Sequence, residues 1–304
     1  MNKKLLMAAV ALLAAGAVLL GVGAVIDRGR GGASGLGAVP GKEQAGEDRE
    51  TAPPGDSAAS DAALSGENAA QLELGPFSQV DLSVVAADVR FEEGESYGLR
   101  YRLHPDEAVV RAEVEGETLR FSTKTREGAS ISGDWEVVVT IPRDARLADL
   151  SAVTVSGDIS LSGRAMDTLR LATTSGDIAA AAVTAHEVQA ASTSGAIAIT
   201  DLSTHSVNAA STSGNVSLTG TADSLELAAT SGACAFSGEL TGSGSVGTVS
   251  GNIDVAVPGA GAEANSLGEI TWNGRSQGRS LHIPGDGPFL TLGSVSGDIR
   301  VTTE

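Results

Sequence analysis

Short apolar runs recur along the second half of the chain at a nearly constant interval. Each pair of runs flanks a Ser-Gly dipeptide, with apolar residues seven and five positions before the glycine and two and four positions after it, and only Gly244 breaks these columns. A fixed period near 20 residues with columns of similar apolar residues is typical of a solenoid, in which each coil covers the apolar face of the next. The first five steps are 19, 19, 19, 18 and 19 residues, and the glycines are Gly157, Gly176, Gly195, Gly214, Gly232, Gly251 and Gly297.

The column two positions after each glycine is expected to stack as a ladder in the core. In such a ladder neighbouring coils lie about 4.8 Å apart, which is the strand spacing of a sheet. Each side chain is then covered by its own counterparts in the coils on either side. The members of this core ladder are Ile159, Ile178, Ile197, Val216, Cys234, Ile253 and Ile299.

The Ser-Gly pair itself is predicted to be a corner of the coil. The apolar pairs before and after it are out of phase by one residue, so a straight strand would turn one pair into solvent. Glycine suits a corner where either a positive φ or a very close approach of neighbouring coils leaves no room for a side chain. All seven glycines are therefore assigned to this corner, and either two or three strands would fit a coil of 19 residues.

One further copy of the repeat is degenerate. Gly268 follows Gly251 by 17 residues and keeps the expected apolar residue Ile270, but the step from Gly268 to Gly297 is 29 residues. The pattern therefore predicts a loop within residues 272–289 that bulges out of the coils. Loops that interrupt a solenoid often carry binding sites, so the candidate binding residues of this loop are Trp272, Arg275, Arg279 and His282.

Residues 72–150 alternate apolar and polar positions with a period of two, as in Val80, Leu82 and Val84. This alternation predicts short strands, and we expect them to cap the open end of the coils, because an uncovered sheet edge invites aggregation. The predicted fold is therefore all-β. It is a single-stranded β-solenoid with coils of ~19 residues over 151–304, preceded by a strand-rich capping region over 72–150.

The N-terminal part of the chain has a different pattern. Leu5–Ile26 contains no charged residue, and its 22 residues would form a helix of about 33 Å, which is enough to span a bilayer core. We expect residues 5–26 to be an uncleaved signal anchor rather than a cleaved signal peptide, with residues 1–4 as a short tail. Residues 27–71 are rich in Gly, Ala, Ser, Pro and charge, which predicts a disordered linker. A short tail before the anchor and a large domain after it favour a single-pass cell-membrane protein with an extracytoplasmic domain.

Composition and charge exclude several functions. The formal net charge of −18 argues against nucleic-acid binding, which depends on Lys and Arg. The single cysteine, Cys234, permits no intrachain disulfide, and its place in the core ladder predicts an inert, buried thiol with a raised pKa. Ala196 and Ala233 interrupt the Asp/Asn column after the corner glycine, so this column is interpreted as outward polar turn residues and not as a calcium site. The four histidines have no recognisable ligand spacing, and we expect no metal, no cofactor and no catalytic residue.

Ile141-Pro142 followed by repeated copies of a Val/Thr-Ser-Gly-Asp/Asn-Ile motif, first at Val155–Ile159 and last at Val295–Ile299, extends over residues 72–304. This plan resembles the "putative adhesin" family of bacterial β-strand-repeat domains of unknown function. The resemblance implies a membrane-associated envelope protein without an assigned enzymatic activity. We therefore expect a non-enzymatic, membrane-anchored module that binds a protein or glycan in the manner of an adhesin. The alternatives are an envelope scaffold or stress-signalling partner of another membrane protein and, less favoured, a carbohydrate-active β-helix enzyme.

Overall fold

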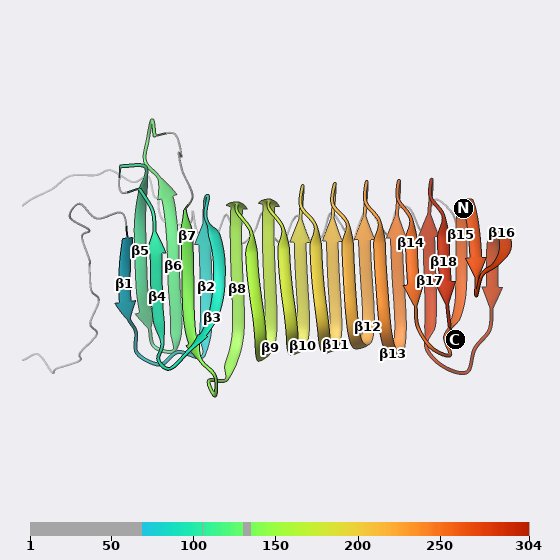
Figure 1. The fold of residues 1–304 in the computed structure, drawn as a ribbon, viewed down its shortest axis with the longest axis horizontal. Coiled ribbons are helices and arrows are strands. Elements are labelled where there is room, and N and C mark those ends of the chain that lie inside the picture. The colour runs from blue at the N-terminus through green and yellow to red at the C-terminus, as the bar shows by residue number, and fades with distance from the viewer. Residues whose placement is uncertain (1–68, 105, 130–134, 304) are drawn as a thin grey trace, which may run out of the picture.

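The computed structural model describes residues 69–104, 106–129 and 135–303, and this part of the chain contains strands and turns but no helix. The prediction of an all-β fold is confirmed. All 18 strands join one sheet that winds into a long solenoid (Figure 1). The predicted tail, anchor and most of the linker lie outside the described residues. Within the described ranges, no helix is long and apolar enough to cross a membrane.

The strands follow one another closely along the chain. In chain order they are β1 (Ala69–Glu73), β2 (Gln79–Val84), β3 (Asp88–Gly94), β4 (Gly98–Arg102), β5 (Ala108–Glu115), β6 (Thr118–Thr125), β7 (Glu136–Pro142), β8 (Leu147–Ser156), β9 (Ile159–Ser175), β10 (Ile178–Ser192), β11 (Ile197–Ser211), β12 (Val216–Ala229), β13 (Cys234–Thr248), β14 (Ile253–Ala256), β15 (Gly261–Trp272), β16 (Arg275–Ile283), β17 (Phe289–Ser294) and β18 (Ile299–Thr302).

The repeated motifs stack in parallel register through the middle of the molecule. Ile178 of β10 pairs with Ile159 of β9 on one side and with Ile197 of β11 on the other. Each of the seven side chains assigned to the core ladder has at most 1% of its surface exposed. The core is therefore a set of aliphatic columns that run along the solenoid axis, perpendicular to the strands.

Each coil contains three short runs rather than two. In β10 the buried positions are two residues apart within a run but three residues apart from Ala180 to Val183 and again from Ala185 to Val188. A step of three changes the side that faces the core, so the chain must turn at each of these places. The first turn has a positive φ at Ala182, with φ 52°, and the Ser-Gly corner closes the coil.

The corner needs glycine because neighbouring coils approach one another very closely. A Cβ atom on Gly195 would lie 1.7 Å from the carbonyl oxygen of Gly176, and a Cβ on Gly214 would lie 1.9 Å from that of Gly195. Among the seven corner glycines, a positive φ occurs only at Gly157. Steric exclusion between coils, and not backbone conformation, is therefore the general reason for the recurring glycine.

Two ladders of polar groups support the same corner. Three positions before the glycine, a buried Ser or Thr donates its hydroxyl to the glycine carbonyl of the preceding coil, as Ser211 does to Gly195 at 3.1 Å and Thr248 to Gly232 at 3.0 Å. One position after the glycine, an Asp or Asn side chain accepts the backbone N–H of the next coil, as Asp177 does from Ala196 at 2.7 Å. The polar column after the glycine thus satisfies backbone donors at the corner.

Ala229 interrupts the hydroxyl ladder and offers no donor to the carbonyl oxygen of Gly214. Replacing Ala229 by serine is expected to raise the free energy of unfolding by about 0.5–1 kcal/mol, since it adds the hydrogen bond that neighbouring coils have. Chemical denaturation of the variant measures the gain. Ala228→Ser, also at a buried position, is the matched control and should give no gain. Equal effects of the two substitutions would contradict the role assigned to the ladder.

The coils begin earlier in the chain than the predicted boundary at residue 151. The segment formed by β2 and β3 is a complete corner of the solenoid, because Val80 pairs in parallel with Leu150 and Val89 with Ile159. β6 and β7 form another coil on its outer side. Among the strands at this end, β1, β4 and β5 pair exclusively in antiparallel fashion and form the cap. The predicted capping region is therefore mostly solenoid.

The sequence contained a signal for this early coil. In this coil Ala87 takes the place of the corner glycine. Buried apolar residues lie seven and five positions before it and two and four positions after it, as in the later coils; they are Val80, Leu82, Val89 and Phe91. Ala87 stands in the column of the corner residues, because its carbonyl oxygen would lie 2.1 Å from a Cβ atom on Gly157, the corner glycine of the next coil.

At the other end of the solenoid, the last strands of the chain do not form the outermost coil. β17 pairs in parallel with β13 on one side and with β15 on the other, so the Gly297 coil lies between the Gly251 and Gly268 coils. The neighbour of Gly268 is accordingly Gly297, whose carbonyl oxygen would lie 2.5 Å from a Cβ on Gly268. The sequence order of these coils and their spatial order differ.

The segment predicted to be a bulging loop is a β-hairpin. β16 pairs antiparallel with β15 and covers the end of the solenoid (Figure 1). The two strands are joined by Asn273 and Gly274, which both have a positive φ, of 45° and 74°. Asn-Gly is the preferred dipeptide of a two-residue hairpin turn, so the sequence did contain this signal. The sequence placed a loop somewhere within residues 272–289, and in the structure Arg275–Ile283 of this range is strand β16 of the hairpin.

Candidate functional site

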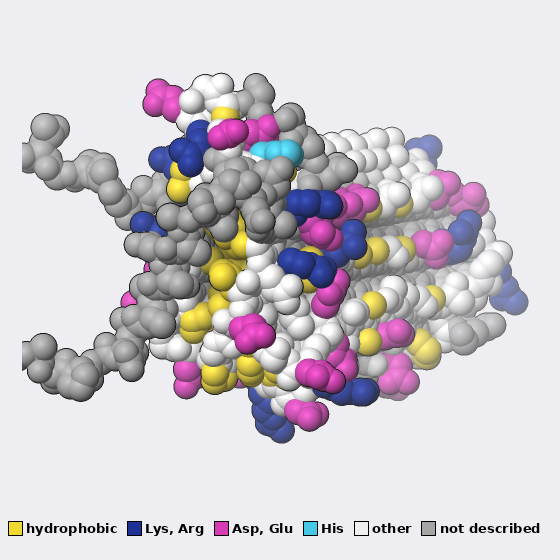
Figure 2. Space-filling view, turned by 60° about the vertical axis from the view of Figure 1, so that its left-hand side comes forward, with side chains coloured by type: hydrophobic (Ala, Val, Ile, Leu, Met, Phe, Trp, Pro, Cys, Tyr) yellow, Lys and Arg dark blue, Asp and Glu magenta, His cyan; other side chains and the backbone are white. Residues whose placement is uncertain are grey.

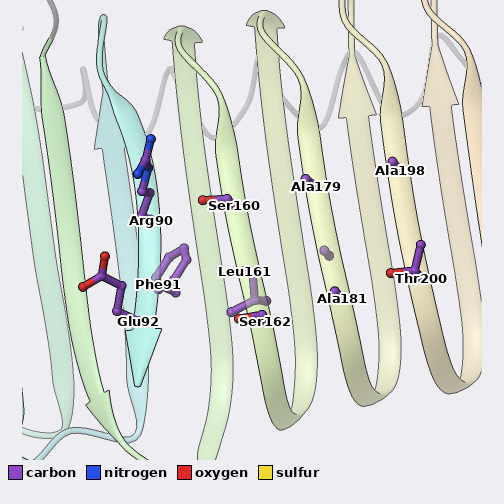
Figure 3. A pocket seen from close by; sticks show the side chains of 11 residues that line it. Arg90, Phe91, Glu92, Ser160, Leu161, Ser162, Ala179, Ala181, Ala198 and Thr200 are labelled. Carbon is purple, nitrogen blue, oxygen red and sulfur yellow. The ribbon is translucent and has the colours of Figure 1, made fainter. Parts of the chain in front are cut away.

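A groove of about 290 Å³ crosses the outer surface of β3, β9, β10 and β11 (Figure 3). Its residues come from the first run of three successive coils and from the preceding strand β3. Small side chains line most of it, and two charged side chains stand on β3. The outward side chains that line it are Arg90, Glu92, Ser160, Ser162, Ala179, Ala181, Ala198 and Thr200.

Strand alternation places these side chains outside. Ile159 and Leu161 point into the core, so Ser160 and Ser162 between and after them point outward. The parallel register then aligns Ser160 with Ala179 and Ala179 with Ala198. The surface is hollow here because the outward positions of these coils carry only the short side chains of Ala, Ser and Thr.

The charged end of the groove is open to solvent. Arg90 forms an ion pair with Glu136 at 3.7 Å, and Glu92 forms one with Arg100 at 3.9 Å. Exposed pairs of this length stabilise a protein by at most about 1 kcal/mol, so a ligand can compete for these groups at little cost. Figure 2 shows acidic and basic side chains interspersed on the face that it presents, beside uncharged areas.

The residues of the predicted binding loop lie elsewhere. Arg275, Arg279 and His282 are exposed on β16, and Trp272 is half-buried at the start of the hairpin turn. β16 covers the C-terminal end of the solenoid, whereas the groove lies towards the other end (Figure 1). The structure therefore pairs Trp272 with Arg275 but places Arg279 and His282 further along β16, and none of the four residues lines the groove.

Two of the histidines are brought together by the coil period. The rings of His186 and His205 stack with centroids 4.8 Å apart and an angle of 4° between the planes. The two residues are 19 positions apart, which is one coil, so the period of the solenoid places them side by side. Asp223, one coil further, accepts hydrogen bonds from Thr241 and His205, and these bonds lower the pKa of its carboxyl group.

Two buried polar groups have structural roles. Burial raises the pKa of the Cys234 thiol to about 12, so the thiol is protonated at neutral pH and is a poor nucleophile. Arg164 is 4% exposed and donates to the carbonyl oxygens of Glu92, Ile141 and Pro142. Desolvation lowers the pKa of this arginine, an effect that the charge of Glu93 opposes. The guanidinium thus ties the first coils together where β3 and β7 end.

Several solved structures are similar to this chain at low sequence identity. One is a "putative adhesin" from Bacteroides fragilis, with 14% identity and a TM-score of 0.49 over 77% of this chain and 95% of that chain. A second is a "putative lipid binding protein" from Parabacteroides distasonis, with 15% identity and a TM-score of 0.45 over 77% of this chain and 97% of that chain. A third is a "putative cell adhesion protein" from Clostridium sporogenes, with 11% identity and a TM-score of 0.25 over 78% of this chain and 99% of that chain.

Sequence comparison gives a family but no characterised relative. No curated protein matches the chain. A single family model, however, matches residues 77–302 without interruption. This range begins just before β2, includes every coil of the solenoid and ends in β18. The chain belongs to the Toastrack DUF4097 family.

Proposed function

We propose that this protein is a non-enzymatic envelope module that is anchored in the cell membrane and binds a glycan, in the manner of an adhesin, along the groove over β9, β10 and β11. The proposal depends on the groove, which combines a floor of small side chains with an accessible charged end. A floor of this kind lets an extended polymer lie directly against the sheet.

The chemistry of the groove favours a ligand rich in hydroxyl groups. The floor is the face of a sheet, where backbone N–H and C=O groups are already paired between coils. An extended peptide could not form a ladder with such a face, because β-augmentation needs a free edge. Ser160, Ser162 and Thr200 offer hydroxyls, and the neighbouring alanines offer methyl groups. Arg90 and Glu92 add a donor and an acceptor at one end.

The anchor and linker fit a module that is displayed at a surface. Leu5–Ile26 is long enough for a bilayer, and residues 27–71 would hold the solenoid away from it. Multivalent display on a membrane would raise the apparent affinity of a shallow site. The expected orientation places the solenoid outside the cytoplasm.

A matched pair of arginine substitutions tests the groove. Ala179→Arg fills the floor, whereas Ala235→Arg makes the same change in the same outward column three coils away, about 14 Å along the axis. Cells that express the full chain are exposed to a panel of purified bacterial and host-surface polysaccharides. Ala179→Arg is expected to weaken binding at least about tenfold, or ~1.4 kcal/mol, and Ala235→Arg to leave it unchanged.

The same cells also test whether the solenoid is displayed outside the cytoplasm. External protease should abolish binding by intact cells if the solenoid lies outside the cytoplasm. Retention of binding in Ala179→Arg would exclude the groove as the site. If no polysaccharide binds but another membrane protein co-purifies with the full chain, the scaffold or signalling alternative replaces this proposal.

A further inference from the structure

The histidine pair on the surface of the solenoid is the second place where chemistry-bearing side chains converge. In the parallel register the exposed position at the second turn of four successive coils carries Asp167, His186, His205 and Asp223. Two imidazoles therefore occupy neighbouring coils with a carboxylate on each side. Both histidines are exposed, so the pair is accessible from solvent.

The hydrogen bond from His205 to Asp223 defines the proton position on that ring. Nδ1 of His205 lies 2.7 Å from Oδ2 of Asp223, and an ionised carboxylate only accepts hydrogen bonds. Nδ1 therefore carries the proton, and Nε2 of the neutral ring keeps a free lone pair. Metal-binding histidines in proteins are oriented in this way, with the second nitrogen bonded to a carboxylate. Asp223 is itself held by the hydroxyl of Thr241.

We propose that His186 and His205 form a two-histidine site for a divalent transition-metal ion, with Asp223 as the residue that positions His205. The rings are parallel and 4.8 Å apart. Two nitrogens on one metal ion lie at most about 4 Å apart, twice a metal–nitrogen bond length of about 2.1 Å. The nitrogen lone pairs of stacked rings run parallel, so both exposed side chains must also rotate about their side-chain bonds before the two nitrogens point at one ion.

The donor set also indicates which ions are accepted. Within the described residues no group of three or more His, Cys, Asp and Glu side chains is placed to hold a metal ion, so the protein supplies two donors and water supplies the others. Imidazole suits Cu²⁺, Ni²⁺ and Zn²⁺, and Cu²⁺ binds such sites most tightly. Mg²⁺ and Ca²⁺ prefer oxygen ligands and should not compete.

Calorimetric titration of the untagged full chain in detergent tests the site, with Cu²⁺, Ni²⁺ and Zn²⁺ each added alone. One equivalent of Cu²⁺ should bind, and its electron paramagnetic resonance spectrum should show coupling to two nitrogens. His186→Ala and His205→Ala should each weaken binding by more than about 100-fold, and Asp223→Ala by about tenfold to 100-fold. His282→Ala removes another exposed histidine, on β16, and should have no effect.

Two outcomes would overturn the inference. One is that the wild-type chain binds no more metal than the double variant His186→Ala/His205→Ala. The other is that either single variant binds Cu²⁺ as the wild type does. Circular dichroism of each variant shows whether the fold is retained, and at two exposed positions we expect no change. These measurements do not depend on glycan binding, so failure of the metal site and failure of the groove proposal are distinguishable.

Discussion

Replacing Gly195 by alanine is expected to lower the free energy of unfolding by about 3 kcal/mol, the upper end of the usual cost of overpacking. The added Cβ would lie 1.7 Å from the carbonyl oxygen of Gly176, so the two coils would have to separate at the corner. Separation would lengthen the ladder bonds between β10 and β11 and loosen the packing of Ile178 against Ile197. Chemical denaturation followed by circular dichroism measures the loss.

Gly75→Ala is the matched control for this prediction. Gly75 is exposed, its φ is not positive, and a Cβ atom there would meet nothing within 4 Å. The substitution reduces the freedom of the unfolded chain and should be neutral or slightly stabilising. A similar small effect at Gly195 would show that the corner can accommodate a Cβ atom. Close approach of the coils would then not explain the recurring glycine.

Ile299→Ala is expected to cost about 2–5 kcal/mol, as in the centre of a protein core, although residue 299 is only five positions before the last residue of the sequence. Chain termini usually tolerate change because they fray. Here Ile299 is fully buried and pairs with Ile253 on one side and with Ile270 on the other. The cost follows from the insertion of β18 between two other coils.

Arg300→Ala, at the adjacent position, is the control for the inserted strand. Arg300 is exposed and forms an ion pair with Asp254 at 3.1 Å, whose loss should cost at most about 1 kcal/mol. Both variants are compared by thermal and chemical denaturation. If Ile299→Ala were as mild as Arg300→Ala, the last strand would not be held between the Gly251 and Gly268 coils.

The candidate site shows why surface features were harder to predict than the core. The groove depends on the small size of Ala179, Ala181 and Ala198 relative to the charged residues of β3. β3 is far from β9 in the sequence but adjacent to it in the sheet. The histidine pair, in contrast, could have been found from the sequence, because its spacing is one coil.

The sequence alone determined the all-β character, the period of the coil, the inward columns and the corner at the Ser-Gly pair. These features are local, since the phase of apolar residues fixes which side of a strand faces a core, and a change of phase across the Ser-Gly pair marks a turn. The tertiary structure decided the order of the coils at both ends, the closing hairpin of β15 and β16, and the groove. Any strand with the same apolar phase can pair with the same ladder, so the local pattern does not select its neighbours. Burial summed over the whole fold selects them. The coil beside the Gly268 coil is therefore the Gly297 coil and not the Gly251 coil, which precedes it in the sequence.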